Sequence, residues 1–327
     1  MTAAKTQPLT HSEIEAYRVC PQLHAYAYAQ QLAPAGEWAS PLAVGRAVGA
    51  GVAHALTTAG VQLDSVIAAA GASLAVDGHA CLERVALDRR DQITAQIATD
   101  GMRCATMLRG WWDAWGGSQE GLDVTRAEVT ITAPLVCPDT GTPSRAYHLQ
   151  GRLDGVYRVG GVGDRYGVYE LKTTSDTVGE VEAYLRHGTQ VALYQYLLGE
   201  RLRGIGQDPV RDQAPTVVDV VKKPTAKRRR TGPRAESEED YWQRCVADYA
   251  ADPQRYFLRA EIEVDPGAHD EARRQAVRVA RCLRQDAQHG RLVVRGPRCK
   301  GPYGWCRYRG LCWYHRIDDY ERVERGG

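Results

Sequence analysis

The stretch that decides the fold is GRLDGVYRVGGVGDRYGVYELKTTSD, residues 151–176. Apolar and polar residues alternate on both sides of its glycine-rich turn, which predicts two antiparallel strands joined by a short connection. Because strand side chains alternate between faces, Glu170 and Lys172 share one face. The hairpin can bring Asp154 beside Glu170. The stretch therefore predicts two carboxylates and a lysine gathered on one face of a sheet.

This trio of side chains suits a particular chemistry. Two carboxylates in close approach repel each other and lose hydration, and a divalent cation such as Mg²⁺ or Mn²⁺ between them relieves both costs. A lysine ammonium beside such a site stabilises negative charge on a phosphate, so the trio fits metal-assisted hydrolysis of a phosphodiester. The alternative is a surface ion pair on a hairpin. These residues alone leave both interpretations open.

The rest of the sequence fits an α/β protein. Its 327 residues are 43% apolar, as in ordinary globular proteins. Residues 42–116 alternate helical patterns with glycine-rich joints, and residues 125–133, TRAEVTITA, predict a strand before the hairpin. We expect a small mixed central sheet flanked by helices, with an N-terminal helical layer.

Charge and cysteine content narrow the function classes. The 42 basic and 40 acidic residues nearly cancel, so attraction for nucleic acid must come from local patches. The N-terminus is polar, and no run of about 18 apolar residues stands out, so we expect a cytoplasmic protein without a membrane partner. Nine cysteines without a secretory signal favour metal ligation, catalysis or burial over a disulfide framework.

A helical segment follows the hairpin. GTQVALYQYLLGERL, residues 188–202, places Gln190 and Tyr194 one turn apart on the same face. The chain thus carries the ordered series G-x-x-D, E-x-K and Q-x-x-x-Y. This series resembles the RecB-like branch of the PD-(D/E)XK nuclease superfamily, over roughly residues 124–221. The resemblance implies a restriction-endonuclease-like core in which Gln190 and Tyr194 position the site or the DNA.

The resemblance also implies roles for the hairpin residues. Asp154 and Glu170 correspond to ligands of Mg²⁺ or Mn²⁺, with the Leu171 carbonyl as a further ligand, and Lys172 corresponds to the catalytic lysine. Glu128, on the polar face of the preceding strand, is either a supporting carboxylate or a solvated strand residue.

One feature departs from the family pattern. These nucleases commonly have an upstream helix of the form G-x-x-x-H, whose histidine approaches the metal. In GRAVGAGVAHAL the pattern that starts at Gly45 meets Gly49 in place of the histidine. His54 lies five residues further on, on a rotated face of the helix. It is a candidate metal ligand only in a different helix register, and a packed or surface histidine otherwise.

The C-terminal cysteines form a C-x6-C-x5-C run, RCKGPYGWCRYRGLCWYH, with Cys299, Cys306 and Cys312. Iron–sulfur variants of the same nuclease branch tie one N-terminal cysteine to three clustered C-terminal ones around a [4Fe-4S] cluster. Cys20, in YRVCPQLHAYAY, corresponds to that N-terminal cysteine. A four-cysteine zinc site is the chemical alternative, and unliganded thiols are a third possibility.

A basic segment follows a predicted core strand. VVDVVKKPTAKRRRTGPR holds seven lysines and arginines within residues 222–234. It is either a DNA contact or a solvated loop. The candidate DNA-binding residues are Lys222, Lys223, Lys227, Arg228, Arg229 and Arg230.

The expected organisation is a single nuclease domain over residues 1–327. Its parts are an N-terminal helical part (10–123), a catalytic core (124–221), a basic loop with flanking helices (222–290) and a cysteine cluster (291–316) that closes on Cys20.

The resemblance implies a metal-dependent DNA nuclease, with exonuclease action favoured, in DNA recombination, repair or phage DNA metabolism. The chain lacks the helicase motif G-x-x-x-x-G-K-[ST], so unwinding would need a helicase or recombination protein as partner. A homo-oligomer is conceivable. The alternatives are a catalytically silent DNA-binding or assembly module of the same fold and a zinc-stabilised structural protein.

Overall fold

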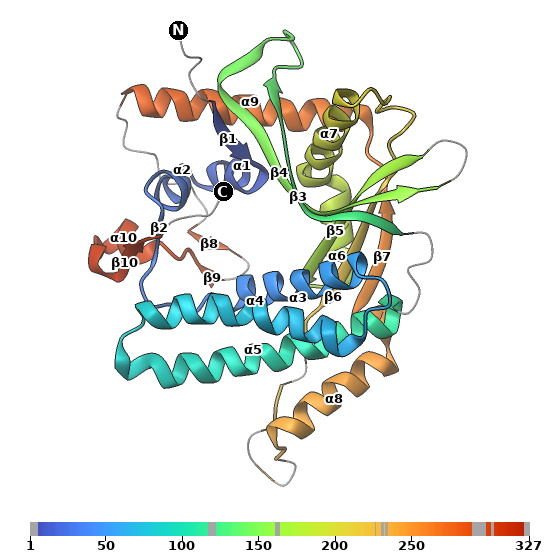
Figure 1. The fold of residues 1–327 in the computed structure, drawn as a ribbon. Helices are drawn as coiled ribbons and strands as arrows, with labels where there is room; N and C mark the ends of the chain where they lie inside the picture. Colours follow the sequence, from blue (N-terminus) through green and yellow to red (C-terminus); the bar gives the residue numbers. More distant parts are fainter. Residues whose placement is uncertain are drawn as a thin grey trace. The chain divides into compact units, whose positions relative to one another are not determined.

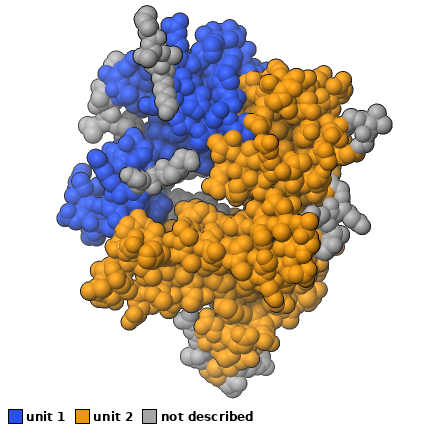
Figure 2. Space-filling view, in the orientation of Figure 1, with its two compact units in different colours: residues 1–37, 131–151, 265–327 blue, residues 38–130, 152–264 orange. Residues whose placement is uncertain are grey.

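The computed structural model describes residues 6–116, 122–160, 164–225, 227–229, 232, 235–289, 299–301 and 304–323. The chain forms two compact units, each assembled from segments that are far apart in the sequence (Figure 2). Unit 1 consists of Met1–Glu37, Ile131–Gly151 and Asp265–Gly327, and unit 2 consists of Trp38–Thr130 and Arg152–Val264. The division of a single domain into four parts stays a prediction.

Unit 2 holds most of the sheet and the long N-terminal helices (Figure 1). Its helices are α3 (Ser40–Thr57), α4 (Leu63–Arg84), α5 (Arg90–Trp111), α6 (Val178–His187), α7 (Thr189–Gly204) and α8 (Glu238–Ala251). Its short 3₁₀ and π turns are η2 (Leu87–Arg89), η3 (Trp112–Gly116) and η4 (Pro253–Arg255). Its strands are β5 (Arg165–Thr174), β6 (Thr216–Lys222) and β7 (Phe257–Ile262), and β3 (Asp123–Val136) and β4 (Pro143–Val159) run through both units.

The sheet is mixed. β4 pairs antiparallel with β5, β5 pairs parallel with β6, β6 pairs antiparallel with β7, and β3 pairs with β4. Every residue of β6 is buried, as expected for a central strand that is covered on both faces. The structure confirms the expected fold class: a mixed sheet flanked by helices, with an N-terminal helical region.

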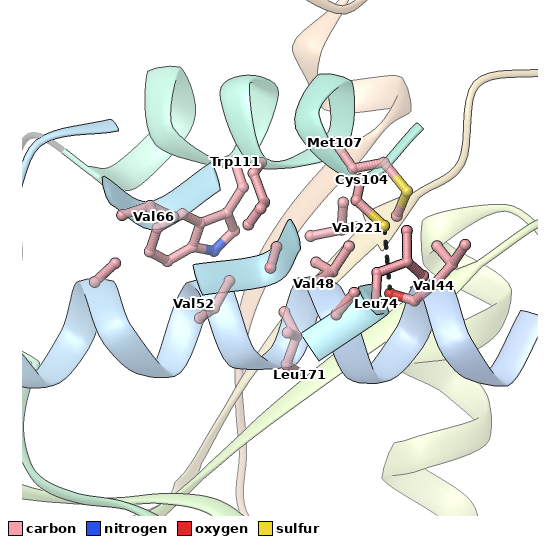
Figure 3. Packing of buried hydrophobic residues seen from close by; sticks show 14 of the residues in the cluster. Val44, Val48, Val52, Val66, Leu74, Cys104, Met107, Trp111, Leu171 and Val221 are labelled. Atoms are coloured by element: carbon pink, nitrogen blue, oxygen red, sulfur yellow. Dashed lines mark hydrogen bonds between the residues drawn. The ribbon is translucent and has the colours of Figure 1, made fainter. Parts of the chain in front are cut away.

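Helices α3, α4 and α5 cover one face of the sheet in unit 2. Three valines of α3, each one turn from the next, pack with Trp111 of α5 and Leu171 of β5 (Figure 3). The helices approach closely at Gly51, where an added Cβ would lie 2.8 Å from Cδ1 of Leu108. A larger residue at this position would therefore push α3 away from α5.

Helices α6 and α7 cover the opposite face. Leu185 of α6 and Val191 of α7 pack with Val218 and Val220 of β6 in a second buried cluster. The even-numbered residues of β6 therefore face α6 and α7, and the odd-numbered residues face α3 to α5. The same alternation determines on which face of the sheet each polar residue lies.

Unit 1 combines the two ends of the chain with the β3–β4 turn. Strand β1 pairs parallel with the N-terminal half of β4, and the Tyr17 hydroxyl of α1 donates to Asp286 of α9 at 2.7 Å. Two small antiparallel sheets pair β2 with β10 and β8 with β9. The elements of this unit are β1 (Gln7–Thr10), α1 (His11–Val19), α2 (Pro21–His24), η1 (Ala25–Ala29), β2 (Leu32–Pro34), α9 (Pro266–His289), β8 (Lys300–Gly301), β9 (Gly304–Trp305), α10 (Arg309–Tyr314), η5 (Ile317–Asp319) and β10 (Tyr320–Arg322).

Among the described residues, one helix is long and apolar enough, by length and composition alone, to cross a membrane. This helix is α4. No such stretch was expected from the sequence. The buried residues of α4, among them Val66, Ala70 and Leu74, recur every four residues on one side. One-sided burial of this kind is typical of a helix that packs on a protein core.

A buried acidic hub ties the sheet to the helices of unit 2. Asp219 of β6 is fully buried and accepts hydrogen bonds from Trp111 Nε1 at 2.9 Å and from the Tyr169 hydroxyl at 2.7 Å. Arg259 of β7 donates to both Asp219 oxygens at 2.6 Å. A buried carboxylate is tolerated only when it is paired and hydrogen-bonded, so these four side chains depend on one another.

Replacing the hub carboxylate tests this dependence. Asp219→Ala should lower the free energy of unfolding by about 3–5 kcal/mol, because it leaves the Arg259 guanidinium without its buried partner. Denaturant titration followed by circular dichroism measures the loss. Asp123→Ala is the control: it removes a carboxylate from an exposed ion pair with Arg158 and should barely move the midpoint. Similar losses for both variants would show that Asp219 is no hub.

Candidate active site

The register of β4 on β5 creates the carboxylate pair. Gly155 pairs with Tyr169 in this antiparallel ladder, so Asp154 and Glu170 are the next residues along and lie opposite each other on one face. The Leu171 backbone N–H donates to Asp154 Oδ2 at 2.7 Å and fixes this carboxylate against β5. The structure thus brings together the two carboxylates that the sequence analysis selected.

Glu170 is the centre of the site. It is only 2% exposed, and its Oε1 accepts hydrogen bonds from Lys172 Nζ at 2.6 Å and from Gln190 Nε2 at 2.7 Å. Its other oxygen, Oε2, is buried and has no partner within the described part of the chain. An unpartnered buried carboxylate oxygen is costly, and a divalent cation is a partner that its charge favours.

The pKa values at the site follow from this crowding. Burial and the neighbouring Glu170 carboxylate raise the pKa of Asp154 to about 8, against smaller opposing effects of the Leu171 amide and Lys172. Burial alone would lower the pKa of Lys172, but the Glu170 carboxylate outweighs it, so that the pKa lies above its usual value. Lys172 is therefore protonated and acts as a hydrogen-bond donor. Its single positive charge does not offset the repulsion between the Asp154 and Glu170 carboxylates.

Helix α7 supplies the amide and hydroxyl groups of the site. Gln190 lies in its first turn and Tyr194 one turn later, so the two side chains lie on the same face of the helix. Burial and the Glu170 charge raise the pKa of Tyr194, which keeps its hydroxyl neutral. The helix therefore lines Glu170 with uncharged hydrogen-bonding groups.

The donor set fits magnesium or manganese. In the described part of the chain, no three His, Cys, Asp or Glu side chains gather closely enough to hold a metal ion by themselves. Mg²⁺ commonly binds through only one or two carboxylates, with waters and substrate phosphates completing its shell. Asp154 and Glu170 meet that requirement, and the Leu171 carbonyl stays a predicted further ligand.

Glu128 lies close enough to Asp154 to contribute to the rise of its pKa. It forms an ion pair with Arg152 and has a backbone φ of 55°, in the left-handed region that non-glycine residues rarely adopt. Strain of this kind is retained where the surrounding structure enforces it. Its role as a supporting carboxylate stays a prediction.

His54 is not part of this site. Its Nε2 lies 2.7 Å from the Ser65 hydroxyl of α4, and its Nδ1 lies 3.2 Å from the Thr58 hydroxyl. Both ring nitrogens are thus taken by hydroxyl groups at the end of α3. In the register that α3 adopts, these contacts fit the alternative of a packed or surface histidine, because the side chain turns towards α4.

The first lysine of the basic segment lies in a different environment from the residues that follow it. Lys222 is the last residue of β6, is only 7% exposed, and pairs in the sheet with Thr174. Lys172 pairs with Val220, two residues earlier, so Lys222 lies on the same face as Lys172. Lys222 therefore belongs to the sheet and not to an exposed loop, and its contact with DNA stays a prediction.

The remaining residues of the segment follow the strand. Lys223 is partly buried, and its backbone N–H donates to the Thr174 carbonyl at 2.7 Å. Lys227 and Arg229 are exposed, and Arg228 lies 3.6 Å from a Glu238 oxygen. Their contact with DNA stays a prediction, and Arg230 lies outside the described residues.

Four cysteines of unit 1 line one small pocket. They are Cys20, from the turn between α1 and α2, and Cys299, Cys306 and Cys312 from the C-terminal segment. Burial and the other three thiols raise the pKa of Cys306, which places all four within electrostatic reach. None of the nine cysteines forms a disulfide. The one N-terminal and three C-terminal cysteines therefore line a common pocket, but no two cysteines lie within 4.5 Å, and the cluster stays a prediction.

Asp219, which was not among the predicted site residues, supports the site through Tyr169, the neighbour of Glu170. A signal is present, since a single aspartate interrupts the apolar run VVDVV. Such a residue in a buried strand must have charged or hydrogen-bonding partners. Those partners, however, come from distant segments.

The fold and the site define a class of α/β proteins that hold acidic and basic groups on one face of a mixed sheet. The family model of the PD-(D/E)XK nuclease superfamily matches residues 8–313. The chain therefore belongs to this superfamily, and membership implies a nuclease that acts on nucleic acid with a divalent metal. No curated protein matches the chain.

Because Asp154 and Glu170 repel each other without metal, replacing Asp154 should stabilise the metal-free protein. The same replacement should weaken the stabilisation by metal. In chelator, Asp154→Asn should raise the melting temperature by about 2–4 °C, because it removes about 1 kcal/mol of repulsion with Glu170. With Mn²⁺ at 100 times its Kd, the parent protein should gain about 2.7 kcal/mol of stability and the variant should gain much less. Differential scanning fluorimetry measures both effects.

Glu263→Gln is the matched control, because it neutralises an exposed carboxylate outside the site. It should leave both the melting temperature in chelator and the gain with Mn²⁺ unchanged. Equal stabilisation of Asp154→Asn and the parent by Mn²⁺ would place the metal elsewhere.

Proposed function

We propose that the protein is a metal-dependent DNA nuclease of the RecB-like branch, with an exonuclease mode of action. The observation that carries this proposal is the buried, unpartnered Oε2 of Glu170 opposite the Asp154 carboxylate, with Lys172 bound to the same glutamate. A surface ion pair would be exposed and would need no cation. The 2% exposure of Glu170 argues against that alternative.

The residues of the site divide the work of phosphodiester hydrolysis. Asp154 and Glu170 would hold Mg²⁺ or Mn²⁺, and the cation supplies charge compensation for the oxygens that become negative as water attacks phosphorus and the P–O bond breaks. Gln190 holds Oε1 of Glu170, which fixes the carboxylate. Lys172 stays protonated and offers its ammonium to the phosphate oxygens.

Substitution of site residues tests the activity. Asp154→Ala and Lys172→Ala should each lower the rate of metal-dependent cleavage of end-labelled DNA by about 10²-fold or more, as expected when an electrostatic group is removed from a transition state. Single- and double-stranded substrates, with Mg²⁺, Mn²⁺ or chelator, measure the rates. Glu263→Gln should cleave at the parent rate.

The same assay decides the mode of action. An exonuclease leaves covalently closed circles intact and produces a ladder from one labelled end, whereas cutting of circles would contradict the exonuclease mode. DNA that is bound but never cut would favour the alternative, a catalytically silent binding module. The intact set of Asp154, Glu170 and Lys172 argues against that alternative.

We further propose that Cys20, Cys299, Cys306 and Cys312 hold a [4Fe-4S] cluster. The nine cysteines all belong to the described residues, and no two of them lie within 4.5 Å. The proposal rests on the pocket that all four cysteines line and on the resemblance to iron–sulfur variants of this nuclease branch.

Metal analysis tests the cluster. Anaerobically purified protein should contain about four iron atoms and four acid-labile sulfides per chain, and Cys306→Ser should lose both. Cys282→Ser is the control, because Cys282 does not line the pocket, and it should keep the parent content. One zinc ion per chain without iron would identify the alternative, a zinc-stabilised protein.

The proposed setting is cytoplasmic DNA recombination, repair or phage DNA metabolism. A helicase or recombination protein is the proposed partner, because the sequence lacks the phosphate-binding helicase motif. The exposed Lys227 and Arg229 are proposed contacts for the DNA backbone. Assembly into a homo-oligomer belongs to the same proposal.

A further inference from the structure

Unit 1 contains a second polar pocket, distinct from the cysteine pocket. It has a volume of about 410 Å³ and lies between the β3–β4 turn and one side of α9. Its apolar floor includes Val277 and Ala280 of α9. The family resemblance assigns no role to this part of the chain.

The pocket is strongly cationic. Arg145 of β4 and Arg281 and Arg284 of α9 line it, and the described residues around it include no carboxylate. Within the described part of the chain, none of these three arginines forms an ion pair. The nearby Asp139 is engaged elsewhere, because Arg274 donates to it at 2.8 Å. Three guanidinium groups thus line one space to which the described residues contribute no neutralising charge.

Hydroxyl groups complete the lining. Thr140 and Thr142 of the β3–β4 turn and Ser144 of β4 all border the pocket. The Ser144 Oγ already accepts the backbone N–H groups of Ala146 and Tyr147, at 3.3 and 3.1 Å. Its remaining capacity is as a donor. Arginines and hydroxyl donors together are the groups that bind phosphate oxygens.

The arginines of α9 are held in position. Arg281 and Arg284 are three residues apart and so lie on one face of the helix. The Tyr17–Asp286 hydrogen bond of 2.7 Å secures the helix a short distance further along. Arg281 Nη2 also lies 4.0 Å from the Cys137 sulfur at the start of the turn. The backbone that carries Arg281 and Arg284 is therefore anchored in unit 1, and their exposed side chains line the pocket.

We propose that this pocket binds backbone phosphates of the DNA substrate, as a contact additional to the catalytic site. The proposal rests on the proposed nuclease function, which supplies a polyanion with repeated phosphates. Guanidinium groups from two separate elements suit successive phosphates along a strand, and such contacts position a substrate without reading its sequence.

The test is DNA binding in chelator, where no cleavage occurs. Fluorescence anisotropy of a labelled DNA duplex at several salt concentrations compares the parent with Arg281→Ala/Arg284→Ala. The double variant should bind about tenfold more weakly at low salt. The slope of log K against log salt should fall in magnitude by about 1.8, which corresponds to two lost phosphate contacts.

A matched control removes the same charge elsewhere. Arg201→Ala/Arg278→Ala lacks two exposed arginines that do not line the pocket, and it should bind within about twofold of the parent. Melting temperatures and circular dichroism confirm that each variant is folded. Equal weakening by both double variants, or an unchanged salt slope for the pocket variant, would overturn the proposal.

Two further comparisons separate the remaining outcomes. If inorganic phosphate stabilises the parent but not the pocket variant, while both bind DNA equally, the pocket takes a free phosphate and the DNA assignment is wrong. If the parent never cleaves DNA but the pocket variant alone loses binding, the nuclease function fails and the pocket assignment stands.

Discussion

The antiparallel pairing of β4 with β5 is the constraint on which the active site depends. It places Asp154 opposite Glu170, whose carboxylate is almost fully buried. Lys172 and Gln190 both donate to Oε1 of Glu170 and the Leu171 N–H donates to Oδ2 of Asp154, while Oε2 of Glu170 has no partner among the described residues. The site therefore retains affinity for a cation. The repulsion between the carboxylates makes the metal-free protein less stable.

Other contacts in unit 2 hold the strands together against the repulsion between the Asp154 and Glu170 carboxylates. The ladder of β5 with β6 puts Leu171 beside Asp219, whose carboxylate ties Tyr169 and Arg259 to the helical layer. On the other face, α7 brings Gln190 to Glu170. The two faces of β5 thus have different roles. Its odd-numbered residues pack in the core, and its even-numbered residues form the active site.

Unit 1 shows how chain order and spatial order differ. Cys20 meets cysteines that follow it by nearly 280 or more residues, and Arg145 shares a pocket with Arg281 and Arg284. Closing such long loops costs chain entropy, which a cluster bound to four thiolates would offset. The two pockets have different chemistry, since one is lined by thiols and the other by guanidinium groups.

The sequence by itself determined the local features: the hairpin, its alternation, the face shared by Glu170 and Lys172, and the helix that carries Gln190. These follow from backbone periodicity, which acts over a few residues. Only the tertiary structure decided that Lys222 is buried and that His54 turns towards Ser65. It alone also showed the partners of Asp219 and the arginine pocket, because those contacts join segments far apart in the chain and depend on how whole layers pack.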